Sequence, residues 1–482
     1  MAADYERAAL HALRINPRDR EAWNRWGIGL FNEALTLPNE DALPMLADAA
    51  RKYAVASDLA PSEPAYLRNG GNALFHQGTR TSGDGDALAF FAGACEKYRA
   101  VVRLTPRDHV AWDSWGAALV ETAAREKASG DAPIWHEACV RFAVAADLAP
   151  DKWAYWNNWG VALQKQTEAA GDDAPLYLFR EAGEKYDRAT RAKPEAAATW
   201  RNWGMLLLNY GRLLPGADGT DAFAESHEKF AQSARIEPDN APLLLQWGAL
   251  YTQRIKRAAD ETAAAGFYSA GVACYAKAAE LTPADHVVWN DWGVLLVNFG
   301  DRLRDDSEAV AYFLEAREKY RVAESIAARP IAASNTAAVL IKRARRGADS
   351  VEEVDGLLRE ARSKAETATE RAPELFYGWL NLSGVCIEQA KRAVDAGERT
   401  RLFAEAREKH AAVEQRKPGG GACGLAAIAA LTGDFDVCRA ELERGAAAKT
   451  ITRTSRIERD PDFDAMRGEG WFVALCEGLA DL

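Results

Sequence analysis

A motif of two aromatic residues three positions apart, followed by a glycine, recurs along the whole chain of 482 residues. Its clearest copies are WNRWG at 23–27, WDSWG at 112–116, WNNWG at 156–160, WRNWG at 200–204 and WNDWG at 289–293. The glycine recurs at Gly27, Gly70, Gly116, Gly160, Gly204, Gly248 and Gly293, and Ala337 and Gly384 continue the series. Neighbouring members are 43 to 47 residues apart. This period predicts a tandem array in which one unit is stacked many times.

A proline marks the same period independently of the aromatic motif. It occurs at Pro17, Pro61, Pro106, Pro150, Pro194, Pro238, Pro283, Pro330, Pro373 and Pro418. Before many of these prolines lies a segment of the form A-x-x-x-[YF]-x-x-A, such as Ala182, Tyr186 and Ala189. Aromatic residues at i and i+3 share one face of a helix, and proline ends a helix. Each unit is therefore predicted to consist of two helices.

The combined pattern, W-x-x-[LW]-G-x-x-[YL] and then A-x-x-x-[YF]-x-x-A-x-x-x-x-P, resembles the tetratricopeptide repeat (TPR) over nearly the whole chain. The resemblance implies an all-α fold, a right-handed superhelical solenoid of antiparallel helix pairs. The unit is about ten residues longer than the common repeat of about 34 residues. Because the excess falls between the two helix motifs, we expect both helices to be longer by about five residues, roughly 7 Å each.

The ends of the array and one internal unit depart from the pattern. We predict a lone helix at 1–18, nine helix pairs over 19–418, a final pair of ordinary length at 419–448 and a capping helical segment at 449–482. Around 330–345, Ala333, Thr336 and Ala337 replace the two tryptophans and the glycine, and the preceding proline is displaced. We therefore expect a looser or kinked junction there.

Charge and composition limit the classes of partner. The net charge of −11 argues against sequence-independent binding of nucleic acid and favours a partner with basic character. No long apolar run or leader segment is visible, so we expect a cytoplasmic protein without membrane insertion. Seven cysteines without a C-x-x-C pair are expected to be small buried residues in a reducing compartment. Self-association is left open.

The residues between the two aromatic positions are the candidate binding residues. In the family that this chain resembles, the first helices line a concave groove that binds protein segments. The position just before the second aromatic reads Arg25, Arg68, Ser114, Asn158, Asn202, Gln246, Asp291, Asn335 and Leu382. The preceding position reads Asn24, Leu67, Asp113, Asn157, Arg201, Leu245, Asn290, Ser334 and Asn381.

This row of asparagines resembles the asparagine ladder in the TPR domain of O-linked N-acetylglucosamine transferase, where amides hold a peptide backbone. An amide offers a donor and an acceptor together, which matches a peptide unit. We therefore name as groove candidates Arg25, Arg68, Ser114, Asn157, Asn158, Arg201, Asn202, Gln246, Asn290, Asp291 and Asn335. The alternative interpretation is that these polar side chains are simply solvated on a helix surface.

Other motifs give weaker signals. The run GGGACG at 419–424 matches G-x-G-x-x-G, but it follows KPG rather than a strand, which favours a hinge over a nucleotide site. The run IKRARRG at 341–347 is either a solvated face or a docking patch for an acidic partner. The tripeptide DHV, at 108–110 and 285–287, is predicted to cap helices.

No arrangement of catalytic or metal-binding residues stands out, and no cofactor is expected. The sequence therefore predicts a non-catalytic interaction scaffold or adaptor that binds a protein segment in the groove. Two alternatives remain. One is a permanent structural subunit of a larger complex, with contacts through its convex face and helix edges. The other is an enzyme of unknown type.

Overall fold

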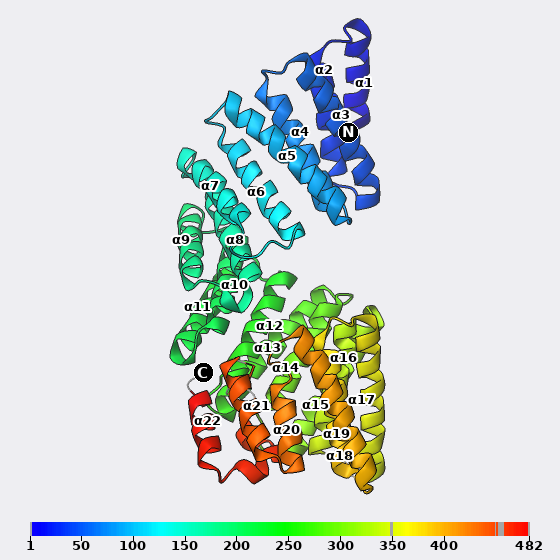
Figure 1. The fold of residues 1–482 in the computed structure, drawn as a ribbon. Helices are drawn as coiled ribbons and strands as arrows, with labels where there is room; N and C mark the ends of the chain where they lie inside the picture. The colour runs from blue at the N-terminus through cyan, green and yellow to red at the C-terminus, as the bar shows by residue number, and fades with distance from the viewer. Residues whose placement is uncertain (1, 348–349, 449, 452–456, 481–482) are drawn as a thin grey trace. The chain divides into compact units, whose positions relative to one another are not determined.

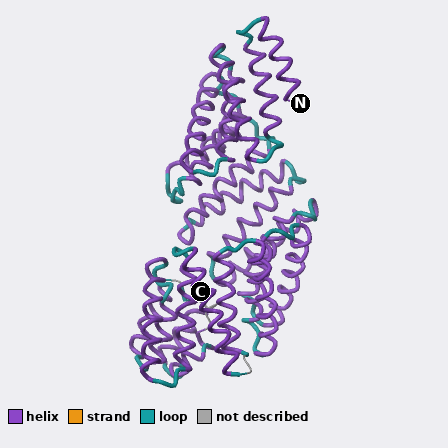
Figure 2. Tube along the Cα trace, turned by 90° about the vertical axis from the view of Figure 1, so that its right-hand side faces the viewer, coloured by secondary structure: helices purple, strands orange, loops and turns teal. Residues whose placement is uncertain are grey.

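The computed structural model describes residues 2–347, 350–448, 450–451 and 457–480. These residues form helices and short connections, with no β-strand among them (Figure 2). They group into two compact units, Met1–Tyr210 (unit 1) and Gly211–Leu482 (unit 2). Within each unit, consecutive helices pack against each other as antiparallel pairs (Figure 1). The predicted all-α fold class is therefore confirmed, and the hand of the superhelix stays a prediction.

Unit 1 contains α1 (Ala2–Ile15), α2 (Arg20–Ala34), α3 (Asn39–Leu59), α4 (Pro64–Arg80), α5 (Asp84–Leu104), α6 (His109–Arg125), α7 (Pro133–Leu148), α8 (Trp153–Ala170), α9 (Leu176–Ala192) and most of α10 (Ala197–Leu213). Unit 2 continues with α11 (Gly216–Ile236), α12 (Ala241–Lys256), α13 (Glu261–Leu281), α14 (His286–Gly300), α15 (Asp306–Ile326), α16 (Pro330–Arg346), α17 (Val351–Arg371), α18 (Phe376–Arg392), α19 (Ala396–Arg416), α20 (Ala422–Thr432), α21 (Phe435–Ala447) and α22 (Gly470–Ala480).

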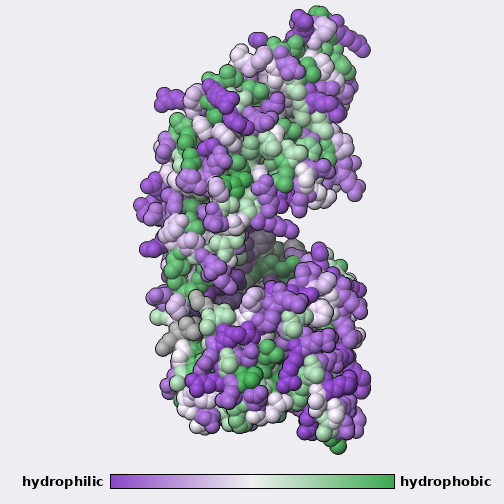
Figure 3. Space-filling model, viewed as in Figure 1, coloured by the Kyte–Doolittle hydropathy of each residue, from purple (hydrophilic) through white to green (hydrophobic). Residues whose placement is uncertain are grey.

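The even-numbered helices from α2 to α18, here called A helices, carry the aromatic motif. They begin 44 to 46 residues apart, and each is followed by a B helix that carries the A-x-x-x-[YF] segment or a variant of it. Asp108 and Asp285 each accept a backbone N–H at the start of α6 and α14. The capping role predicted for the two DHV segments is therefore confirmed. Hydrophilic side chains cover most of the surface seen in Figure 3.

The motif glycine makes room for an aromatic ring of the B helix. A Cβ atom on Gly160 would lie 2.7 Å from Cε1 of the buried Tyr186, which is closer than two non-bonded carbon atoms can approach. The same ring-on-glycine contact joins Gly27 to Tyr53, Gly71 to Tyr98, Gly116 to Phe142, Gly248 to Tyr275 and Gly293 to Tyr320. Each such pair of helices is locked at close approach by one glycine and one ring.

The register predicted for the second helix pair is wrong by one residue. Gly71, and not Gly70, faces the ring of Tyr98. A Cβ atom on Gly71 would lie 2.8 Å from Cε1 of that ring. Adjacent glycines cannot be told apart from the sequence, because only the position of the opposing ring decides which of them is in contact.

The ninth pair is misaligned in the same way. Trp379 donates from its indole to the carbonyl oxygen of Pro373 at 2.9 Å, as the first tryptophan of the motif does elsewhere. The motif glycine is therefore replaced by Ser383, four residues later, and not by Gly384. Ser383 is buried, and its hydroxyl donates to the carbonyl oxygen of Ala406 at 3.2 Å.

The first tryptophan and the proline keep the same period because they are hydrogen-bonded. In six pairs the indole N–H donates to the carbonyl oxygen of the proline six residues earlier, at 2.8–3.1 Å.

The two indoles of a motif stack, with ring centroids 5.7–5.9 Å apart. A B-helix cation covers the second ring at 3.6–4.1 Å: Lys52 over Trp26, Arg141 over Trp115, Lys185 over Trp159 and Lys319 over Trp292. The tryptophans are thus packing residues.

The helix around 330–345 is not kinked, so this part of the expectation is wrong. Pro330 opens α16, which runs unbroken to Arg346. The small side chains that replace the aromatic motif are buried, and Thr336 donates to Glu324 at 2.9 Å. Lys364 of the next B helix binds the same carboxylate at 2.5 Å. Polar bonds therefore replace the stacked indoles, and the chain divides into its two units at 210–211 instead.

The glycine run at 419–424 forms a turn around a carboxylate of the same chain. The backbone N–H groups of Gly419 and Gly421 donate to Glu414 at 2.8 and 2.9 Å. Gly419 has a φ of 79°, which glycine adopts without strain. Because Glu414 occupies these donors, the run is a structural turn and not a phosphate cradle.

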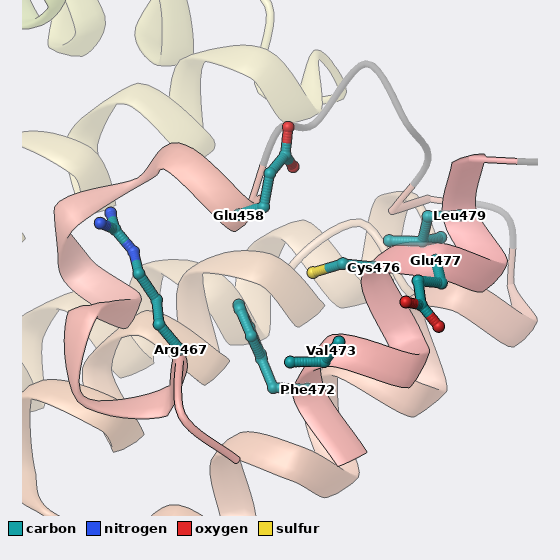
Figure 4. A pocket seen from close by; sticks show the side chains of 7 residues that line it. All are labelled: Glu458, Arg467, Phe472, Val473, Cys476, Glu477 and Leu479. Carbon is teal, nitrogen blue, oxygen red and sulfur yellow. The ribbon is translucent and has the colours of Figure 1, made fainter. Parts of the chain in front are cut away.

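Beyond α21, a closing segment packs on the last helix pair. Phe463, Met466, Phe472 and Leu479 are buried in one cluster with residues of α20 and α21. A pocket of about 500 Å³ lies in this segment. Figure 4 shows Phe472 and Cys476 of α22 on one side of it and Arg467 on the other. The cavity lies within the closing segment and apart from the row of A helices described below. Residues 449, 452–456 and 481–482 of the predicted cap lie outside the described residues.

A histidine takes the place of the B-helix aromatic in α19. His410 is buried, and a Cβ atom on Gly424 would lie 2.1 Å from its Nε2. Neither ring nitrogen has a hydrogen-bond partner among the described residues. Burial lowers the pKa of His410 to about 4, against a smaller opposing effect of Glu414. The fold therefore holds a neutral histidine at neutral pH.

Acidification from pH 7 to pH 5 is expected to cost the last helix pairs about 2 kcal/mol. The unfolded chain takes up the proton first, so stability is complete above pH 6.5 and falls by about 1.4 kcal/mol per pH unit down to pH 4. Hydrogen exchange of α19–α21 at the two pH values measures this. In His410→Phe this part of the pH dependence is expected to vanish. An unchanged pH dependence in that variant contradicts the assignment.

Candidate functional site

With the register corrected, the two positions between the aromatics form two aligned columns on the A helices. The second inner position holds Arg25, Asn69, Ser114, Asn158, Asn202, Gln246, Asp291, Asn335 and Asn381. The first inner position holds Asn24, Arg68, Asp113, Asn157, Arg201, Leu245, Asn290, Ser334 and Leu380. Arg68 and Asn381 therefore belong to the opposite columns from those predicted, and Leu67 and Leu382 belong to neither.

Side-chain amides link neighbouring A helices through these columns. In five places the amide N–H at the second inner position donates to the first inner position of the preceding A helix. The bonds are Asn69 to Asn24 (2.9 Å), Asn158 to Asp113 (3.0 Å), Asn202 to Asn157 (3.3 Å), Asn335 to Asn290 (2.9 Å) and Asn381 to Ser334 (3.0 Å). We call this series the amide ladder. The predicted row of asparagines is present, but some of its amide groups are used in hydrogen bonds between neighbouring A helices.

The ladder is most continuous in unit 1. Asn158 donates to Asp113 and accepts from Asn157 at 3.4 Å, and Asn157 in turn accepts from Asn202. All four side chains are half-buried, so one side of each remains accessible. A carboxamide has two N–H donors and an oxygen that accepts two bonds. The bonds above use one N–H of each amide, so each of the three amides has a second N–H for a further partner.

Asp113 is the acidic end of this chain of side chains. Burial raises its pKa to about 6, and the hydrogen bond from Asn158 opposes that rise. The neighbouring Arg68 is bound to Asp108. Asp113 thus has an amide partner and no cationic partner within the described residues.

The other predicted site residues are placed differently. Arg25 is exposed and pairs with Glu21 at 3.0 Å. Asp291 accepts from Asn290 at 3.0 Å, and burial raises the pKa of this carboxyl. Arg201 Nε and Gln246 Oε1 are buried without a hydrogen-bond partner in the described part of the chain. Ser114 is half-buried. Hydrogen bonds join two continuous sets of the predicted residues: Asn157 with Asn158 and Asn202, and Asn290 with Asp291 and Asn335.

A second ladder, which the sequence analysis missed, joins the C-terminal ends of the A helices. The arginine nine residues after the motif glycine donates to main-chain carbonyl oxygens at the end of the preceding A helix. The bonds are Arg80 to Ala34, Arg125 to Thr81, Arg257 to Arg212, Arg302 to Ala258, Arg346 to Gly300 and Arg392 to Ala344. Carbonyls at the end of a helix lack a partner within that helix, and this arginine ladder gives them one. The carbonyls of Ala34 and Gly300 also accept a backbone N–H from the following turn.

The basic run at 341–347 is used within the fold. Lys342 binds Asp301 at 2.9 Å, Arg343 binds Glu353, and Arg345 binds Glu388 at 2.7 Å. Arg346 belongs to the arginine ladder. The interpretation as a docking patch is therefore wrong, because each of these cations has an internal partner.

No helix in the described residues has the length and apolar character needed to cross a membrane. The described ranges also contain no group of three histidine, cysteine or acidic residues placed to hold a metal ion. Cavities apart from the closing segment lie at α1–α2 and between α17 and α19.

The sequence matches no protein-family model and no curated protein. Among solved structures it is similar to the APC/C hetero-tetramer Cut9–Hcn1, at 11% identity over 96% of this chain and 93% of that one, with a TM-score of 0.40. It is also similar to YrrB, a TPR protein with an unusual peptide-binding site (16% identity, 50% of this chain, 96% of that chain, TM-score 0.32). TTC0263, a thermophilic TPR protein of Thermus thermophilus, gives 14% identity, 52% of this chain, 98% of that chain and a TM-score of 0.33.

At these identities and TM-scores, the similarity carries no information about function. The fold follows from the helices themselves: antiparallel pairs, a ring-on-glycine contact within many of them, and a first tryptophan bonded to the proline that follows the preceding B helix. The chain therefore has a tetratricopeptide-type fold.

Proposed function

We propose that this protein is a protein-interaction scaffold that binds an extended protein segment along the A helices of unit 1. The observation that carries the proposal is the chain of half-buried side chains Asp113, Asn158, Asn157 and Asn202. Their mutual hydrogen bonds fix the direction of the remaining amide donors before any ligand arrives. Pre-organised donors lose little conformational entropy on binding, which favours affinity.

The spacing of these side chains suits a peptide backbone. Neighbouring packed helices lie about 8–10 Å apart, and an extended chain advances about 3.3 Å per residue. Each A helix would therefore meet about every third residue of the bound segment. Recognition through amides reads the backbone and tolerates different side chains. The net charge of −11 and the uncompensated Asp113 favour a segment with basic residues in unit 1.

A test must leave the amide ladder intact, because Asn158→Ala or Asn202→Ala also removes bonds between helices. Ala154 and Ala198 each lie four residues before a ladder asparagine and so share its helix face. The double variant Ala154→Arg/Ala198→Arg adds two bulky side chains to that face. The matched control is Ala192→Arg at the exposed C-terminal end of α9.

Affinity capture from native cell extract, read by mass spectrometry, compares the two variants with the unaltered protein. Proteins that the unaltered chain and Ala192→Arg capture, but the double variant does not, support binding along the A helices of unit 1. Full capture by both variants contradicts the proposal and favours a structural subunit that uses its convex face. Far-UV circular dichroism confirms that each variant is folded.

A further inference from the structure

The helices α1 and α2 lie at the start of the helix row of unit 1 (Figure 1), and a cavity of about 480 Å³ lies against them. Its lining includes Ala8 and Ala9 of α1, and Ala22 and Arg25 of α2. By its position before Pro17, the first proline of the periodic series, α1 is a B helix. The cavity thus lies beside a B helix that no A helix precedes in the described part of the chain.

The following repeats show which element packs at the equivalent position. Both α3 and α5 pack against the A helix of their own pair and against the next A helix. The contacts that hold α2 against α3 and α4 join a side chain of α3 or α4 to a residue of α2. They include the ring of Tyr53 on Gly27, the hydrogen bond from the Tyr66 hydroxyl to Glu21 (3.1 Å) and the bond from Asn69 to Asn24 (2.9 Å).

The equivalent residues of α1 and α2 line the cavity. They are found by counting back from the periodic proline and from the motif glycine: Ala9 in place of Tyr53, Ala22 in place of Tyr66 and Arg25 in place of Asn69. All three face the cavity. It is therefore built from the positions that hold an A helix in the next repeat, and a helix is the element that fits it.

The seat at α1 is wider than the equivalent seats within unit 1, because alanine replaces an aromatic ring. Eight residues before the periodic proline, α1 has Ala9, whereas α3, α5, α7 and α9 have Tyr53, Tyr98, Phe142 and Tyr186. Each of these rings lies on a glycine of its A helix. A guest helix should therefore carry a large apolar side chain where the A helices carry glycine, because that side chain would fill the space that a ring fills in the other pairs.

The rim of the cavity is acidic. Asp4, Asp19 and Glu21 line it, against one cation, Arg25, which binds Glu21 at 3.0 Å. Opposite charges across an interface steer association and disfavour wrong partners. The rim therefore favours a guest helix that has cationic residues beside its apolar face.

We propose that the cavity at α1 and α2 binds a basic, amphipathic α-helix of a partner protein. The guest helix takes the position of an A helix and places a large apolar side chain against Ala9. This is binding of a helix in a groove, which is a different mode from the binding of an extended segment along the amide ladder. The proposal therefore does not depend on the function proposed for the ladder.

The probe is a synthetic peptide with the sequence of α16, residues 330–346, that carries fluorescein and the substitution Ala337→Leu. In the chain α16 packs as an A helix on α17 and α18, and it has cations and no acidic residue. Titration with the full chain, followed by fluorescence anisotropy, is expected to show saturable binding. Binding should be at least tenfold tighter than that of the peptide with Ala337, because leucine and alanine have similar helix propensities but differ in apolar volume.

Variants of α1 test the position of the peptide. Ala9→Tyr restores the ring of the other pairs and is expected to weaken binding of the Ala337→Leu peptide at least tenfold. Ala8→Arg, at an exposed residue of the cavity, should do the same, and it decides the question if Ala9→Tyr fails to fold. The matched control is Leu10→Arg, which adds the same charge at an exposed residue of α1 outside the cavity and should leave binding unchanged.

The absence of saturable binding overturns the proposal, and so does equal affinity of the peptide for the unaltered chain and Ala8→Arg. Binding that is lost in Ala154→Arg/Ala198→Arg, and not in Ala8→Arg, also overturns it, because the peptide would then lie on the amide ladder. Light scattering measures self-association. A dimer of the unaltered chain that Ala8→Arg abolishes would make a second copy the occupant and overturn the proposal for a partner helix.

Discussion

Replacement of Glu388 by glutamine is expected to lower the free energy of unfolding of unit 2 by about 3–5 kcal/mol. The Glu388 side chain is almost completely buried and binds Arg345, Lys391 and Arg392 at 2.7–3.0 Å. Burial alone would raise its pKa, but Arg345 and Lys391 outweigh burial and hold the pKa below its ordinary value. Glutamine removes the charge at nearly constant volume. It leaves Asp460 and Asp462 of the closing segment as the remaining acidic partners of Arg345 and Lys391.

Local hydrogen exchange is the suitable measurement, because a stacked array does not unfold in one step. Backbone amides of α16 and α18 should exchange faster in Glu388→Gln, by the factor that corresponds to the lost free energy of unfolding. The control is Glu443→Gln, which breaks an exposed pair with Arg439 and should cost under about 1 kcal/mol. Equal exchange in both variants contradicts the prediction, because it shows that the ion pairs of Glu388 contribute little to stability.

Tyr186→Ala is expected to destabilise unit 1 by about 3–5 kcal/mol, the usual cost of removing a fully buried aromatic ring. The ring fills the space above Gly160, and its hydroxyl donates to Gln164 at 2.9 Å. The matched control lies on the same helix: Tyr177 is 59% exposed, so Tyr177→Ala should cost no more than about 0.5 kcal/mol.

Denaturant unfolding followed by tryptophan fluorescence compares the two variants. A further variant, Gly160→Leu/Tyr186→Ala, tests the ring-on-glycine contact directly. Leucine should refill part of the space left by the ring, so the two changes should cost less together than the sum of their separate costs. Strict additivity contradicts the role assigned to the glycine.

Much of the fold could be predicted from the sequence because its signals are local. The tryptophan and the proline are six residues apart and bonded to each other, so each copy of the motif reports the same turn. The predicted register was wrong in the two helix pairs where the motif glycine is ambiguous or replaced. Gly70 and Gly71 differ only in which of them meets Tyr98, and Ser383 replaces the marker by which the ninth pair was aligned.

The site could be predicted only in part, because its chemistry depends on the preceding repeat. The asparagines were visible as a row, but their bonds to the neighbouring A helix were not. The arginine ladder had a signal that was missed. Arginine recurs nine residues after the motif glycine at Arg80, Arg125, Arg257, Arg302, Arg346 and Arg392. Asp462, which reaches back to Lys391, had no periodic signal at all.

Both ladders point the same way along the chain. In each, the later helix pair supplies the donor and the earlier pair supplies the acceptor. During synthesis the N-terminal pairs leave the ribosome first, and each new pair therefore carries the groups that attach it to those already folded. A chain cut short between two pairs therefore leaves the ladder acceptors of its last pair without these donors.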